Sequence, residues 1–221
     1  MTQLLASILD ADHARLGVNC QDTLAAGADG IHFDVLDNHF APGLSIGPNT
    51  CKALRTFGIQ APIDIHLMTQ RIASLIDPFV AAGASGLSFH LETDEPIQDL
   101  LDQLRSHGIQ RGLAIDPATP TSQCLPWLDQ IDYLLVMTVQ PGKGGQGFLP
   151  AMFDKITTLK TMISAVEHPP AIVVDGGVRL DNIKAIVAHG ADRCVVGSAL
   201  FGASDLKTAT WQFKQVLDTI K

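Results

Sequence analysis

The chain has 221 residues, of which 46% are hydrophobic and 17% are charged. This composition is typical of a folded globular protein, and no apolar run approaches the roughly 20 residues that span a bilayer, so we expect no membrane segment. The formal net charge of −8 argues against nucleic acid as the main partner. If the ligand is an anion, local groups must hold it.

The chain begins MTQLLASILD, without a basic leader. Four cysteines lie far apart in the sequence, and none forms a Cys-x-x-Cys pair. We therefore expect a cytoplasmic protein that has no signal peptide, no disulfide framework and no cysteine-based zinc site.

Short apolar runs with the composition of β-strands recur along the chain. In chain order they are LLASIL (4–9), GIHFDVL (30–36), PIDIHLM (62–68), GLSFHLE (86–92), RGLAIDP (111–117), YLLVMTV (133–139), AIVVDGG (171–177) and RCVVGSAL (193–200). Helix-like stretches such as RLDNIKAIVAHG separate most of them, and several of these stretches end at a glycine, which is a typical helix stop.

Eight such units predict an α/β protein with a (β/α)8 TIM barrel. No Pro/Ser-rich linker or charge block divides the sequence, so we interpret residues 1–221 as a single barrel domain. A doubly wound sheet is the alternative fold. It would be favoured by a G-x-G-x-x-G turn after the first strand, and SILDADHARLG contains none.

Polar residues alternate with apolar ones on several predicted strands, and residues two apart share one face of a strand. In a barrel, the interior face would carry His32 and Asp34, Asp64 and His66, and Asp175. Most of these residues lie near the carboxyl ends of their strands, where barrel active sites are built. Imidazole and carboxylate groups together suit Zn²⁺, Fe²⁺, Mn²⁺ or Co²⁺. His90 and Glu92 alternate in the same way, but we assign them to the polar rim.

Glycine-bearing turns follow the last three predicted strands: QPGKGGQGF (140–148), DGGV (175–178) and VVGSAL (195–200). Glycine lets backbone N–H groups approach an anion, and the turns after strands seven and eight are the usual phosphate position in this fold. Gly177, Gly197 and Ser198 are the expected phosphate contacts. The longer segment 140–148 could close over a substrate.

Seven segments together resemble the ribulose-phosphate 3-epimerase family and follow its order over nearly the whole chain. They are SILDAD, IHFDVLDNHF, DIHLM, DPATP, VMTVQPGKGGQGF, VDGGV and VVGSALFGA. The resemblance implies a metal-dependent barrel enzyme of the pentose phosphate pathway that interconverts D-ribulose 5-phosphate and D-xylulose 5-phosphate. It also allows for self-association into a homo-oligomer.

The resemblance also assigns residue roles. It implies that one divalent metal ion, zinc first and iron, manganese or cobalt as alternatives, is bound by His32, Asp34, His66 and Asp175. It makes Asp34 and Asp175 the acid–base pair. The implied substrate contacts are Ser7, His66, Gly142, Lys143, Gly144, Gly145, Asp175, Gly176, Gly177, Gly197 and Ser198.

Inversion at C3 of a 2-ketose requires proton removal on one face and proton return on the other. The 2,3-enediolate formed between these steps needs its charge stabilised, which a metal ion can do, while two carboxylates act as base and acid. We expect Asp34 and Asp175 to flank the sugar.

The chain departs from the common family pattern at a few positions. Leu36 and Asn38 replace Met and Gly, and Gln140, Lys143 and Gly147 replace Asn, Phe and Ser. We expect Leu36 to alter a wall of the pocket. Lys143 is either a phosphate contact or a solvated charge on a lid.

Three other functions compete with this one. Leu36 could permit epimerisation of a related ketose phosphate such as D-allulose 6-phosphate. Phosphosugar aldolases and decarboxylases of similar fold use an Asp-x-Lys-x-x-Asp strand, and this chain has DVLDNH without the lysine. A non-catalytic phosphosugar-binding barrel would tolerate the loss of one acid, and both acids are present.

Overall fold

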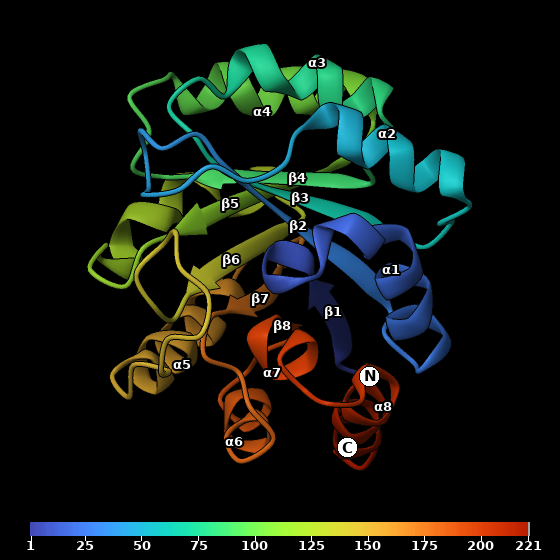
Figure 1. Cartoon of the computed structure of the whole chain (residues 1–221). Helices are drawn as coiled ribbons and strands as arrows, with labels where there is room; N and C mark the ends of the chain where they lie inside the picture. Colours follow the sequence, from blue (N-terminus) through green and yellow to red (C-terminus); the bar gives the residue numbers. More distant parts are fainter. Residues whose placement is uncertain (221) are drawn as a thin grey trace.

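The computed structural model describes residues 1–220 and contains a closed barrel of eight parallel strands. Each strand pairs with its neighbours in chain order, and β8 closes the barrel against β1 (Figure 1). The strands are β1 (Gln3–Ser7), β2 (Gly30–Leu36), β3 (Ile63–Met68), β4 (Gly86–His90), β5 (Gln110–Ile115), β6 (Tyr133–Met137), β7 (Ala171–Asp175) and β8 (Arg193–Val196). The predicted TIM barrel is confirmed.

Helices surround the strands on the outside of the barrel (Figure 1). They are α1 (Leu16–Ala25), α2 (Pro48–Phe57), α3 (Ala73–Ala81), α4 (Ile97–His107), α5 (Met152–Ile163), α6 (Ile183–Ala188), α7 (Ser198–Phe201) and α8 (Leu206–Asp218). Short 3-10 helices cover Ile8–Asp10, His13–Arg15 and Thr121–Gln130. The last of these replaces an α-helix between β5 and β6, where Pro126 lacks the N–H that an α-helical turn would use. Within residues 1–220, none of the helices has the length and apolar character that crossing a membrane requires.

Alternation along the strands divides their side chains between two environments. The apolar residues Ile31, Phe33 and Val35 of β2 belong to the main core between barrel and helices. Inside the barrel, β1 and β5–β8 contribute a second apolar cluster that includes Tyr133 and Met137. The interior side formed by β2–β4 is polar instead. The barrel interior is therefore half apolar and half ionisable, and the ionisable half contains the predicted site.

Candidate active site

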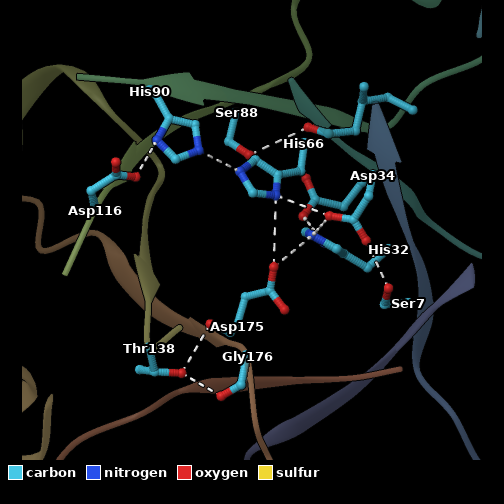
Figure 2. A network of polar contacts seen from close by, with 12 residues as sticks. Ser7, His32, Asp34, His66, Ser88, His90, Asp116, Thr138, Asp175 and Gly176 are labelled. Atoms are coloured by element: carbon cyan, nitrogen blue, oxygen red, sulfur yellow. Dashed lines mark hydrogen bonds and ion pairs between the residues drawn. The ribbon is translucent and has the colours of Figure 1, made fainter. Parts of the chain in front are cut away.

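The register of β2 and β3 brings two histidines and two aspartates into one patch of the barrel interior. His32 pairs with Asp64, and Asp34 pairs with His66. Paired residues of parallel strands in register point to the same face of the sheet, so all four side chains face inward. Asp175, the last residue of β7, points toward this patch from another part of the barrel (Figure 2).

The four residues assigned to the metal lie together at the carboxyl end of the barrel. His66 Nδ1 lies 3.1 Å from Asp34 Oδ1 and 3.7 Å from Asp175 Oδ2. His32 Nε2 lies 3.4 Å from Asp34 Oδ1 and 3.6 Å from Asp175 Oδ2. Both imidazoles are fully buried, and the Asp175 side chain is 14% exposed. Both carboxylates therefore face the same pair of ring nitrogens.

This donor set fits a divalent cation. One ligand atom from each of His32, Asp34, His66 and Asp175 lies within 4.8 Å of all the others. His32 Nε2 is buried and has no hydrogen-bond partner, which is costly for a polar atom unless something else binds it. Two imidazoles and two carboxylates are a ligand combination found for Zn²⁺ and for Fe²⁺, Mn²⁺ or Co²⁺.

Two further groups orient these side chains from below and beside them. Asp64 Oδ2 lies 3.1 Å from His32 Nδ1, and its other oxygen accepts a hydrogen bond from the Tyr133 hydroxyl. This contact assigns the hydrogen of His32 to Nδ1 and leaves Nε2 facing the cluster. Ser7 donates to Asp34 Oδ2 at 2.7 Å. The sequence did not single out Tyr133, although it shares the inward face of β6 with Leu135 and Met137.

The two carboxylates differ in acidity because their surroundings differ. Burial would raise the pKa of Asp34, but the charge of His32 and the close contacts of His32 and His66 with the carboxylate bring it below its ordinary value. Burial and the negative charge of Asp34 raise the pKa of Asp175 to about 7. From the protein groups alone, Asp34 is thus ionised near neutral pH and Asp175 is close to half protonated.

The imidazoles differ as well. Burial would lower the pKa of His32, but the charge and close approach of the Asp34 carboxylate and the contact with Asp64 raise it well above its usual value. Burial lowers the pKa of His66 to about 4, because the hydrogen bond to Asp34 is not enough to offset it. His66 is therefore uncharged at neutral pH.

The assignment of His90 to the polar rim is wrong. Its side chain is 1% exposed, and its ring lies against His66 and Phe40, with ring centroids 5.1 Å and 4.6 Å away. His90 ends β4 on the inward face, and the loop that contains Phe40 covers it from above. Glu92 follows outside the strand and is partly exposed, as a rim residue would be.

A cavity above the four-residue cluster joins it to the glycine-rich turns. Its lining includes all the predicted substrate contacts except His66, which is completely buried beside the acids: Ser7, Gly142, Lys143, Gly144, Gly145, Asp175, Gly176, Gly177, Gly197 and Ser198. Asp34 also reaches the cavity, whereas His32 and His66 lie behind the two carboxylates. One cavity thus connects the acids with turns that can hold an anion.

Gly177 shows why the turn after β7 needs glycine. Its φ of +66° is in the left-handed region, and a Cβ there would overlap the backbone N of Phe148. Phe148 directly follows the loop 140–147, which forms one wall of the cavity. The close approach at Gly177 therefore ties the turn after β7 to this loop.

Leu36 does not form the pocket wall that we expected from the sequence. It is 5% exposed and packs with Ala41 and Met68 instead. The chain after β2 folds back, so that the Ser45 N–H donates to the Leu36 carbonyl and Asp37 pairs with Leu44. This loop covers Leu36, and Met68 lines the cavity in front of it.

Comparison with known proteins gives one consistent family. The sequence profile of the ribulose-phosphate 3 epimerase family matches residues 3–201. A protein of Serratia marcescens named ribulose-phosphate 3-epimerase is 46% identical over 201 residues, covering 91% of this chain and 96% of the relative. The protein of that name from Escherichia coli K12 is 44% identical over 215 residues, covering 97% of this chain and 92% of the relative.

Solved structures of lower sequence identity share the fold. A 3-hexulose-6-phosphate synthase from Salmonella typhimurium superposes with a TM-score of 0.76 at 19% identity, covering 100% of both chains. KGPDC from Streptococcus mutans gives a TM-score of 0.75 at 14% identity, covering 100% of this chain and 99% of that one. At these identities the likeness extends to the barrel alone.

Proposed function

The chain belongs to the ribulose-phosphate 3-epimerase family, and from this premise we propose that it interconverts D-ribulose 5-phosphate and D-xylulose 5-phosphate by inversion at C3. The observation that carries the proposal is the convergence of two carboxylates, Asp34 of β2 and Asp175 of β7, on the same pair of ring nitrogens at one cavity. An epimerase that works through two acids needs a carboxyl group on each side of the reacting carbon, one to remove a proton and one to return a proton.

His32, Asp34, His66 and Asp175 would hold the divalent cation, with zinc first and iron, manganese or cobalt as alternatives. When bound, the cation supplies Lewis-acid stabilisation of the negative charge that develops on the ketose oxygens. Ser7, which donates to Asp34 Oδ2, keeps that carboxylate in place while Oδ1 faces the histidines.

The two acids exchange protons with C3 of the sugar. In one direction Asp34 removes a proton, giving a 2,3-enediolate, and the carboxyl group of Asp175 returns a proton to the opposite face. In the reverse direction they exchange roles. Thr138 donates to the Asp175 carbonyl at 2.9 Å and so fixes the backbone from which this carboxyl projects.

The phosphate would lie at the glycine turns after β7 and β8. Gly177, Gly197 and Ser198 line the cavity there. Their backbone N–H groups can donate to a phosphate dianion, so a protein with a net negative charge can still bind this anion locally. The loop with Gly142, Lys143, Gly144 and Gly145 covers the same cavity and would exclude water from the reacting carbon.

The test is a comparison of two ketose phosphates with the zinc-loaded protein. NMR should detect conversion of D-ribulose 5-phosphate to D-xylulose 5-phosphate, and turnover of D-allulose 6-phosphate should be much slower. Faster turnover of the allulose phosphate would replace the proposed substrate by that sugar. Binding of both sugars without turnover would favour the non-catalytic alternative.

A further inference from the structure

His90 is a buried histidine that the proposed chemistry does not use. Among the histidines within residues 1–220, only His32, His66 and His90 are buried. His90 Nε2 lies 3.0 Å from Nε2 of His66, so the two rings meet edge to edge, with an angle of 21° between their planes (Figure 2). Phe40 also packs against the His90 ring, with ring centroids 4.6 Å apart. The ring is therefore enclosed, and its orientation is fixed.

The other nitrogen of His90 faces two carboxylates. Nδ1 lies 3.2 Å from Glu92 Oε2 and 3.0 Å from Asp116 Oδ1. Glu92 accepts hydrogen bonds from the Asp116 N–H and the Thr119 hydroxyl. These bonds link the end of β4 to the loop after β5.

The loop that contains Asp116 is held in place by a buried lysine. Lys155 of α5 donates from Nζ to the carbonyl oxygens of Asp116 and Thr119, each at 2.6 Å. The lysine is 8% exposed, so these bonds are shielded from water. Asp116 is thus attached to a backbone that has little freedom to move, and the Glu92 carboxylate is bonded to the same loop.

The ring hydrogens of His66 and His90 can be arranged in one way that leaves His66 able to bind a cation. Its Nδ1 faces Asp34 and Asp175 and must keep a free lone pair to act as a ligand. The ring hydrogen of His66 must then be on Nε2, where His90 Nε2 can accept it. The hydrogen of His90 is consequently on Nδ1, where Glu92 Oε2 can accept it, and Asp116 Oδ1 lies close by.

We propose that His90 is a positioning residue for the cation site: it accepts the hydrogen of His66 Nε2 and so keeps His66 Nδ1 turned toward Asp34 and Asp175. Asp64 has the equivalent role for His32, through Nδ1. Each ring is thus fixed by a partner on the side away from the cluster. This inference rests on the proposed function, because it assumes a cation at the four-residue cluster.

The test measures zinc affinity by competition with a chromophoric chelator for two substitutions at His90. His90→Phe keeps a flat ring but removes the acceptor, and His90→Gln retains a side-chain oxygen that can accept. Ser88→Ala is the matched control, because Ser88 is buried on the same strand and donates to the Ile65 carbonyl, outside the imidazole pair.

We expect His90→Phe to weaken zinc binding by about 10- to 100-fold, the usual effect of losing a group that orients a metal-bound histidine. His90→Gln should recover most of this affinity, and Ser88→Ala should bind like the wild type. The visible absorption of the Co²⁺-loaded protein should change in His90→Phe and return toward that of the wild type in His90→Gln. A role in packing alone does not predict rescue by an acceptor.

Thermal unfolding first establishes that each variant is folded. If His90→Phe does not fold, the double variant Glu92→Gln/Asp116→Asn removes the charges that hold the His90 hydrogen and leaves the core intact. We expect it to weaken zinc binding in the same direction, and wild-type affinity in that variant would contradict the proposal.

Four results would overturn the inference. The first is a zinc affinity of His90→Phe equal to that of the wild type, and the second is an equal loss of zinc affinity in His90→Phe and His90→Gln. The third is a loss of zinc affinity in Ser88→Ala as large as that in His90→Phe. The fourth is binding of two zinc ions by the wild type, of which only the second depends on His90. The last result would make His90, Glu92 and Asp116 a separate cation site. Failure of the proposed function is distinguishable, because then the wild type itself would bind no divalent cation.

Discussion

The carboxylates of Asp34 and Asp175 approach the same atom, Nδ1 of His66, at 3.1 and 3.7 Å. Asp34 belongs to β2 and Asp175 to β7, and β1 and β8 separate these strands on the shorter path around the barrel. The two acids therefore reach one point from different directions. Their proximity also explains part of the raised pKa of Asp175, after the larger effect of burial.

Replacing either acid by its amide should nearly abolish epimerisation. Asp34→Asn and Asp175→Asn keep the side-chain shape but remove proton transfer and one charged ligand, so we expect kcat to fall by at least about 10²- to 10⁴-fold. Steady-state rates at saturating zinc, with thermal unfolding to verify the fold, make the measurement. Asp181→Asn, on an exposed turn, is the control and should be unaffected. Wild-type turnover in either active-site variant would rule out the two-acid mechanism.

Zinc affinity should rise with pH across neutrality. The pKa of Asp175 is raised to about 7 and that of His32 is raised well above its usual value, so both groups carry protons that a cation must displace. Asp34, with its lowered pKa, and His66, with a pKa of about 4, have already lost theirs. Competition titrations should show a gain of about 10- to 100-fold per pH unit between pH 6 and 7.

The variant Asp175→Asn separates the two protons. Its asparagine does not titrate, so zinc binding to this variant displaces one proton fewer. The slope of log zinc affinity against pH should therefore decrease by up to about 1. An affinity that is constant with pH in the wild type would contradict the assignment of these residues as ligands.

Gly177→Ala should raise KM for the phosphosugar by about tenfold or more, through loss of one to two backbone donors to the phosphate. The added Cβ would meet the backbone N of Phe148 while the residue stays at a φ of +66°. Gly147→Ala is the control, because a Cβ there meets nothing within 4 Å. Zinc affinity should be unchanged in both. A similar KM in the two variants would remove the turn after β7 from the phosphate site.

Lys143→Phe should change KM more than it changes metal content. Lys143 lines the cavity from the covering loop and is exposed, so we expect its charge to contribute about 0.2–1 kcal/mol to binding a phosphate dianion, which is about a 1.4- to 5-fold change in KM. Added salt should reduce the difference between wild type and variant. Lys52→Phe, at an exposed position of α2, is the control for loss of one positive charge. A loss of zinc without a change in KM would place Lys143 outside the phosphate site.

The alternation of polar and apolar residues predicted the barrel and most of the site, because a strand in a closed sheet has only an inner and an outer face. That rule placed His32, Asp34, His66 and Asp175 on one surface without knowledge of their distances. It also placed His90 on the inner face, but it could not tell a rim position from a buried one. The difference depends on Phe40, which comes from a loop 50 residues earlier in the sequence.

Two other features depend on contacts between distant segments. The Tyr133 hydroxyl reaches Asp64 across 69 residues of sequence, so no local pattern indicates it. Leu36 is removed from the cavity by the return of the chain at Ser45, whose hydroxyl also accepts from the Leu36 N–H at 2.9 Å. Side-chain alternation gives the face of a residue, and the loops above the barrel decide what covers it.

The most direct test of the account follows the hydrogen at C3 of the sugar. Zinc-loaded protein is incubated with D-ribulose 5-phosphate in D₂O, and both sugars are observed by NMR, with a chelator-treated sample as control. We predict D-xylulose 5-phosphate that carries deuterium at C3 from the first turnovers, since the returning proton comes from a second acid that exchanges with solvent. The chelator should abolish it, and added zinc should restore it. Product that keeps its original hydrogen at C3 would contradict proton transfer by Asp34 and Asp175.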